Sequence, residues 1–168
     1  KPRRDLKLTL FATDLDEEAI ETARAGMYPP NIAADVSPER LRRFFSEGER
    51  GYRVAPEIRQ LVVFAPHNVA TDPPFTKLDV LSCRNLLIYL EPELQKRLLS
   101  TFHYGLNPGG ILVLGTSETV GMAAREFTAV TEKTRIYRRV EPAGGTREAL
   151  PAGARSWRPS DAQDGVGS

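Results

Sequence analysis

Residues 78–90 read LDVLSCRNLLIYL, and this stretch decides the fold. Its first six residues form a short apolar run, which predicts a buried strand that ends directly before Arg84 and Asn85. Residues 92–106 follow with an apolar stripe at helical spacing, made of Leu94, Leu98, Leu99, Phe102 and Leu106. An Asn-Pro-Gly-Gly turn at residues 107–110 then leads into a second apolar run at residues 111–114. This order of strand, helix and strand indicates an α/β protein.

The same alternation continues on both sides of this unit. Residues 8–13 predict a strand ending at Asp14, and residues 17–25 predict a helix with Gly26 as its C-cap. Ser37 and Pro38 mark the start of another helix. Residues 52–54 and 61–64 are strand candidates, the second expected in the main sheet, and residues 127–130 and 135–137 predict a closing antiparallel pair. The sequence therefore predicts an α/β class with a mostly parallel sheet.

Composition excludes several classes of function. The net charge is +1 over 168 residues, so there is no electrostatic case for nucleic-acid binding. No run approaches 18 apolar residues, so no membrane insertion is expected. The single cysteine, Cys83, cannot form an internal disulfide and fits a reducing, cytoplasmic compartment. From residue 141 to residue 168 Gly, Pro, Ala, Arg, Ser and Asp dominate, which predicts a disordered tail or linker.

Ligands of open α/β sheets bind outside the carboxyl ends of the strands. Asp14 occupies such an end, where a carboxylate can accept hydrogen bonds from both ribose hydroxyls of an adenosine. Asp14 or Asp16 could equally cap the following helix by accepting from free backbone N–H groups. The position of Asp14 alone does not separate an adenosylmethionine site from a nicotinamide site.

Arg84, Asn85 and Tyr89 are the second candidate group. Arg and Asn at a sheet edge can bind a carboxylate or an amide. The alternative is a structural salt bridge for Arg84 and a core position for Tyr89. Cys83 fits a buried inert thiol better than a nucleophile, because neither histidine is an evident partner. His67 with Cys83 does not make a metal set, so no metal is expected.

Several motifs together resemble the CheR family of chemotaxis methyltransferases. They are residues 11–16 (FATDLD), 23–28 (ARAGMY), 82–90 (SCRNLLIYL), 102–115 (FHYGLNPGGILVLG) and 117–118 (SE). The CRN-x₃-Y run is highly specific in this context, whereas ATD alone is not. Residues 32–39 (IAADVSPE), 63–68 (VFAPHN) and 72–75 (DPPF) resemble most the branch fused to a CheB-type methylesterase and PAS modules.

The resemblance implies a class I, Rossmann-like S-adenosylmethionine-dependent methyltransferase domain over residues 1–140, with a small antiparallel β-subdomain at about residues 47–63. It implies methylation of glutamate side chains on the cytoplasmic domain of chemoreceptors, with S-adenosylhomocysteine as the product. A fused or associated CheB-type methylesterase and PAS modules are further expected partners. The loop at residues 48–51 looks shorter than in members that grip a receptor's terminal peptide.

The resemblance also assigns roles to single residues. Asp14 would hold the ribose, and Asn68 and Val69 would lie beside the adenine. Arg84 and Asn85 would line the methionine end, and Tyr89 would lie near the reacting centre. Tyr89 and Arg84 are thus the catalytic candidates, and the cofactor-binding candidates are Asp14, Asn68, Val69, Arg84 and Asn85.

The sequence departs from the family pattern at its start. The family's N-terminal helical domain, its first sheet strand and a glycine-containing cofactor loop have no counterpart here, so we expect a sheet lacking its first strand and weak cofactor binding by this chain alone. A catalytically inactive cofactor-sensing or scaffold module of the same fold is therefore the alternative. A nicotinamide dehydrogenase is a third reading, which the 82–85 run and the closing hairpin oppose.

Overall fold

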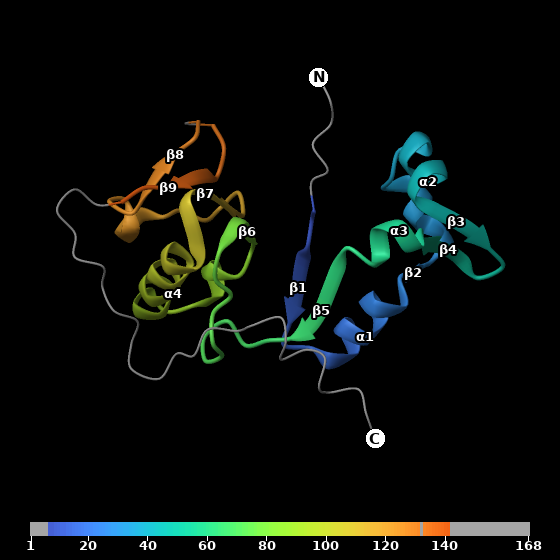
Figure 1. Cartoon of the computed structure of the whole chain (residues 1–168), viewed down its shortest axis with the longest axis horizontal. Coiled ribbons are helices and arrows are strands. Elements are labelled where there is room, and N and C mark those ends of the chain that lie inside the picture. Colours follow the sequence, from blue (N-terminus) through green and yellow to red (C-terminus); the bar gives the residue numbers. More distant parts are fainter. Residues whose placement is uncertain (1–6, 132, 142–168) are drawn as a thin grey trace. The chain divides into compact units, whose positions relative to one another are not determined.

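The computed structural model describes residues 7–131 and 133–141, so the tail predicted over residues 141–168 lies outside the described residues from residue 142 onward. The chain divides into two compact units, Lys1–Asn68 and Val69–Ser168. Both combine helices with strands, as the α/β prediction requires (Figure 1). Within the described residues, no helix is both long and apolar enough to span a bilayer.

The first unit is built on a parallel strand pair and an antiparallel sheet. Strand β1 (Leu10–Asp14) pairs with β5 (Val62–Pro66), in register from Leu10 opposite Val62 to Asp14 opposite Pro66. The antiparallel sheet has the order β2-β4-β3. The remaining elements of the unit, in chain order, are α1 (Glu17–Ala25), β2 (Met27–Tyr28), the 3₁₀ helix η1 (Pro30–Ala34), α2 (Pro38–Phe44), β3 (Phe45–Gly48), β4 (Gly51–Val54) and α3 (Pro56–Arg59).

Local signals set the ends of these helices as predicted. Asp16 accepts hydrogen bonds from two backbone N–H groups in the first turn of α1, and Gly26 ends that helix with a left-handed φ of 62°. The Ser37 hydroxyl accepts from Arg40 N at the start of α2, and Pro38 occupies its first position. Arg59 then links α3 to its neighbours, donating to the carbonyls of Arg24 and Val62.

Over residues 69–131 and 133–141, the second unit is a four-stranded sheet with one long helix. The sheet order is β6-β7-β9-β8, in which β6 and β7 are parallel and the other pairs antiparallel, so this sheet is mixed rather than mostly parallel. Its elements are β6 (Leu78–Cys83), the 3₁₀ helix η2 (Leu87–Tyr89), α4 (Pro92–Gly105), β7 (Leu106–Leu114), the 3₁₀ helix η3 (Gly121–Ala123), β8 (Phe127–Ala129) and β9 (Ile136–Arg139).

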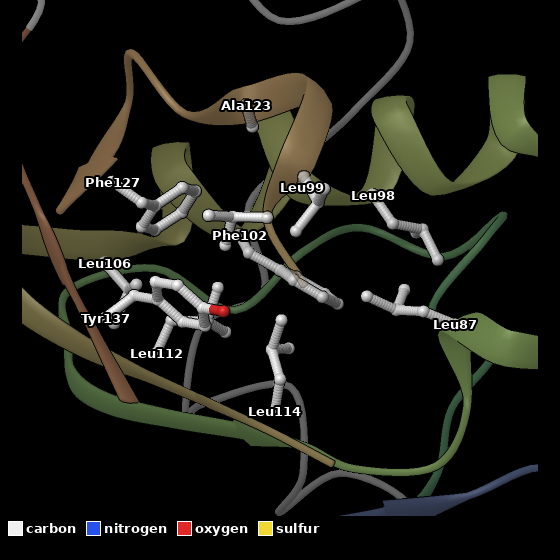
Figure 2. Packing of buried hydrophobic residues seen from close by; sticks show 11 residues of the cluster. Leu87, Leu98, Leu99, Phe102, Leu106, Leu112, Leu114, Ala123, Phe127 and Tyr137 are labelled. Carbon is white, nitrogen blue, oxygen red and sulfur yellow. The ribbon is translucent and has the colours of Figure 1, made fainter. Parts of the chain in front are cut away.

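The core of this unit lies between α4 and the sheet. Figure 2 shows side chains from α4 meeting side chains of β7 and β9. The buried residues are Leu87, Leu98, Leu99, Phe102, Leu106, Leu112, Leu114, Val120, Ala123, Phe127 and Tyr137. The helical stripe predicted from spacing supplies four of them, Leu98, Leu99, Phe102 and Leu106, and Leu94 packs against the cluster. Burial of such side chains stabilises the fold by roughly 1.5–3 kcal/mol each.

Two predicted extents differ from the structure. The antiparallel sheet consists of β2, β3 and β4 and ends at Val54, before the predicted limit at about residue 63. Val62 and Val63 belong instead to β5, which pairs with β1. The predicted turn at residues 107–110 lies inside β7, which pairs with β6 through Leu106 and again from Ile111. The Pro-Gly-Gly residues are therefore absorbed as an irregularity of the strand pair.

Candidate functional site

In the first unit, the carboxyl ends of β1 and β5 bring two predicted site residues to one edge. Asp14 and Pro66 are register partners at the ends of these strands. The pairing extends one step further, because His67 N donates to the Asp14 carbonyl at 2.9 Å. Asn68 follows directly and is half-buried. The structure thus places Asp14 and Asn68 at the same edge of one parallel strand pair.

The Asp14 side chain is exposed at this edge. Its Oδ1 accepts a hydrogen bond from Asp16 N at 3.1 Å. Asp16, by contrast, caps α1, with Oδ1 at 2.9 Å from Glu18 N and 3.1 Å from Ala19 N. The capping role that the sequence left open between these residues therefore belongs to Asp16, and the Asp14 carboxylate is held by a short turn while it faces solvent.

In the second unit, β6 and β7 end side by side. Cys83 is the register partner of Leu114, so Arg84 and Asn85 leave the sheet at the same edge as Gly115. Arg84 and Asn85 are both exposed. Asn85 has a φ of 58°, a left-handed conformation that asparagine tolerates better than most residues. The chain therefore makes a sharp turn at the point where the two polar side chains are presented.

Glu118 stabilises this turn through hydrogen bonds to its carboxylate. Its side chain is 3% exposed. Oε2 accepts from Asn85 N at 2.9 Å and from Gly115 N at 2.6 Å, while Oε1 accepts from Leu87 N at 2.7 Å. One carboxylate thus joins the segment after β6 to the segment after β7.

These bonds explain how a buried carboxylate remains charged. Burial by itself would raise the pKa of Glu118, but the backbone hydrogen bonds from Gly115, Asn85 and Leu87 outweigh burial and lower the pKa below its usual value. Hydrogen bonds to a charged acceptor contribute roughly 1.5–3 kcal/mol each, enough together to offset the loss of hydration. Glu118 is therefore an anion fixed between two backbone segments.

Gly115 is required by the same arrangement. A Cβ at this position would lie 2.7 Å from Glu118 Oε2 and 2.9 Å from Asn85 N, and it would also overlap Asn85 Oδ1. Such separations are shorter than side-chain contacts allow. The close approach of the three residues therefore needs a glycine at the end of β7.

The next residues are divided between core and solvent. Leu87 is 2% exposed and points into the cluster of Figure 2, so it anchors the segment. Tyr89, two residues later, is 79% exposed, which rules out the core position that was its alternative. Among the described residues, the salt bridges are Arg24–Glu21 and Arg139–Glu141, and neither involves Arg84. Both catalytic candidates are thus exposed side chains on an anchored backbone.

Cys83 has the environment of an inert thiol. It is only partly accessible at the end of β6. Burial and, secondarily, the nearby negative charge of Glu118 raise its pKa from 9.0 to about 11. A thiol with such a pKa is a poor nucleophile at neutral pH. In the part of the chain that the structure describes, no group of three or more His, Cys, Asp or Glu residues could hold a metal ion.

The predicted site residues thus fall into two groups, each described within its own unit. Asp14 and Asn68 belong to the first unit, and Arg84, Asn85 and Tyr89 to the second. Val69 also belongs to the second unit, where its side chain packs against the hydrophobic core.

The sequence motifs include Glu118, in the Ser-Glu pair at residues 117–118, but assign it no role. The available signal was an acidic residue three positions after the glycine that ends an apolar strand. Its contacts with Asn85 and Leu87, 33 and 31 residues away, could not be read from local pattern.

Comparisons with known proteins identify the family of the chain. Residues 2–136 match the family described as "CheR methyltransferase, SAM binding domain". The chain is 44% identical over 135 residues to an uncharacterized 104.1 kDa protein of Rhodobacter capsulatus, covering 80% of this chain and 14% of that protein. It is 36% identical over 142 residues to a chemotaxis protein methyltransferase of Vibrio parahaemolyticus, covering 82% of this chain and 49% of the relative.

A third relative is the chemotaxis protein methyltransferase of Escherichia coli, 37% identical over 128 residues, with 71% of this chain and 44% of the relative covered. The chain thus spans about half or less of the length of these relatives. A solved S-adenosylmethionine-dependent methyltransferase from Mesorhizobium loti is 18% identical with a TM-score of 0.38, over 80% of this chain and 47% of that chain. The family match over most of the chain shows that it belongs to the CheR methyltransferases, as their S-adenosylmethionine-binding domain.

Proposed function

We propose that this chain forms the cofactor-binding part of a methyltransferase that transfers a methyl group from S-adenosylmethionine to glutamate side chains on the cytoplasmic domain of chemoreceptors. The observation that carries the proposal is the edge after β6 and β7, where Glu118 fixes a turn that presents Arg84, Asn85 and Tyr89. The names of the chemotaxis methyltransferase relatives support the reaction and the class of substrate. We expect the protein to act in the cytoplasm.

The chemistry of the donor groups fits the cofactor. An exposed carboxylate at the end of β1 suits a ribose diol, which offers two hydroxyl donors to Asp14. An exposed guanidinium and a side-chain amide suit the carboxylate and ammonium of the amino-acid part, and Arg84 and Asn85 offer these groups. Asn68, half-buried after β5, has the amide groups that an adenine edge needs, and we propose Val69 as its apolar neighbour at the ring.

Little proton chemistry is required of the protein. When bound, S-adenosylmethionine supplies an electrophilic methyl group. The side chain of a free glutamate has a pKa of about 4.3, so at neutral pH the accepting carboxylate is already ionised and no residue of this chain has to remove a proton. The role left to Tyr89 and Arg84 is to orient the reacting groups, which accounts for large rate factors in such reactions.

Two measurements on the full-length protein that carries this chain test the proposal. Calorimetry should detect S-adenosylhomocysteine binding at micromolar Kd, about −8 kcal/mol, and no binding of NAD. Radiolabelled S-adenosylmethionine should then label glutamates of a chemoreceptor cytoplasmic domain. Binding without methyl transfer to any receptor would favour a cofactor-sensing or scaffold module, and binding of NAD alone would overturn the methyltransferase reading.

A further inference from the structure

Among the described residues, the carboxylate of Glu118 is a buried charged group to which the proposed reaction gives no task. It lies beneath the exposed residues that the proposal uses, and its partners are backbone N–H groups rather than a basic side chain. A buried carboxylate that only filled space could be replaced by an apolar side chain at lower cost. The position of its partners shows what the charge does.

Those partners belong to two backbone segments near the exposed side chains of Arg84 and Asn85. Asn85 N and Leu87 N belong to the turn after β6, and Gly115 N belongs to the end of β7. Because Asn85 adopts a left-handed backbone, the turn is not the conformation that this residue favours by default. Three hydrogen bonds to one anion, with Leu87 anchored in the core, hold it there.

We infer that Glu118 is a positioning residue, whose carboxylate fixes the backbone of residues 85–87 and thereby sets the direction in which Arg84 and Asn85 meet the amino-acid end of the cofactor. This inference rests on the proposed function and adds to it a residue that touches neither substrate nor cofactor. Under this inference Glu118 fixes the turn, whereas Arg84 and Asn85 bind the ligand.

Glu118→Gln tests the inference in the full-length protein. The amide keeps the size of the side chain but replaces one acceptor oxygen by a donor that faces backbone N–H groups. We expect S-adenosylhomocysteine to bind about 10- to 150-fold more weakly, as if the displaced turn had lost one charge-assisted hydrogen bond to the ligand. Glu118→Asp keeps the charge but is one methylene shorter, so we expect a smaller loss of affinity and partial recovery relative to the glutamine variant.

Glu126→Gln is the matched control in the same unit. Glu126 is half-buried, and its buried Oε2 has no hydrogen-bond partner among the described residues. We expect its affinity to stay within twofold of the wild type. A lower melting temperature for Glu118→Gln with unchanged affinity of the folded protein would show a merely structural role and overturn the inference.

A measurement on the wild type covers the case in which Glu118→Gln does not fold. Addition of S-adenosylhomocysteine should shift the amide resonances of Asn85, Leu87 and Gly115, and those of residues around Glu126 much less. Binding that leaves the three resonances unchanged would overturn the inference while the proposed function stands. A wild type that binds no S-adenosylhomocysteine would overturn the proposed function, and the inference with it.

Discussion

The backbone nitrogen of Gly115 lies 2.6 Å from Oε2 of Glu118, and a Cβ on Gly115 would lie 2.7 Å from the same oxygen. The glycine is thus both a donor to the carboxylate and the reason that the carboxylate can come so close. This relationship couples the end of β7 to the turn that presents Arg84 and Asn85.

Gly115→Ala should therefore disturb stability and the site together. The added methyl would overlap Asn85 as well as Glu118, and such overpacking typically costs about 1–3 kcal/mol. We expect a lower free energy of unfolding by urea titration and weaker binding of S-adenosylhomocysteine. Gly121→Ala is the control, because its Cβ would meet only Thr119 Cγ2 at 3.8 Å. Equal behaviour of the two variants would contradict the packing described for Gly115.

Asp14→Ala and Asp16→Ala should separate binding from folding in the first unit. Asp14→Ala removes the exposed carboxylate assigned to ribose, so we expect about 10- to 150-fold weaker S-adenosylhomocysteine binding. Asp16→Ala removes the cap of α1 and should lower stability by about 0.5–2 kcal/mol with little effect on affinity. Calorimetry and thermal melts of both variants give the comparison. The reverse pattern would show that the two roles are exchanged.

Tyr89→Phe should affect turnover without affecting stability. The side chain is 79% exposed, so removal of its hydroxyl leaves the core unchanged. We expect kcat for receptor methylation to fall by about 2- to 12-fold, the range of one lost neutral hydrogen bond, with an unchanged melting temperature. Tyr104→Phe, also exposed but on α4, should match the wild type in both measurements. Wild-type turnover in Tyr89→Phe would remove the hydroxyl from the mechanism.

Cys83 should react slowly with alkylating reagents in the folded protein. Its pKa of about 11 in place of 9.0 reduces the thiolate at pH 8 by roughly 100-fold. Iodoacetamide labelling, followed by mass spectrometry, should accordingly be about 100-fold slower than in the urea-unfolded chain, and the sequence has no second cysteine to confuse the signal.

The raised pKa of Cys83 also fixes the direction in which stability changes with pH. The folded state holds the thiol proton more tightly than the unfolded state. The contribution of the Cys83 thiol to the free energy of unfolding is therefore complete below about pH 9 and is lost as the pH rises toward 11. Cys83→Ala should flatten this alkaline loss of stability. Fast labelling at pH 8 would contradict the burial of the thiol.

The sequence by itself determined the order of the main strands and helices, because the signals involved are local, but it did not predict the short elements β2, β3 and α3. Helical spacing predicted the buried face of α4, and the residues at 16, 26 and 37–38 marked helix ends that the structure contains. The alternation of elements placed Asp14, Asn68, Arg84 and Asn85 after strands, and the pairing of β1 with β5 and of β6 with β7 brings them to strand edges.

Only the tertiary structure decided which of these residues are fixed by hydrogen bonds or burial, and which partners fix them. The choice of Asp16 rather than Asp14 as the cap depends on side-chain geometry that both sequence positions permit. The exposure of Tyr89 follows from Leu87 taking the core position two residues earlier. The role of Glu118 depends on backbone groups 31 and 33 residues away, which reach it only because β6 and β7 pair in register. Local pattern carries no information about such partners, since a hydrogen bond across two strand ends exists only once the sheet has formed.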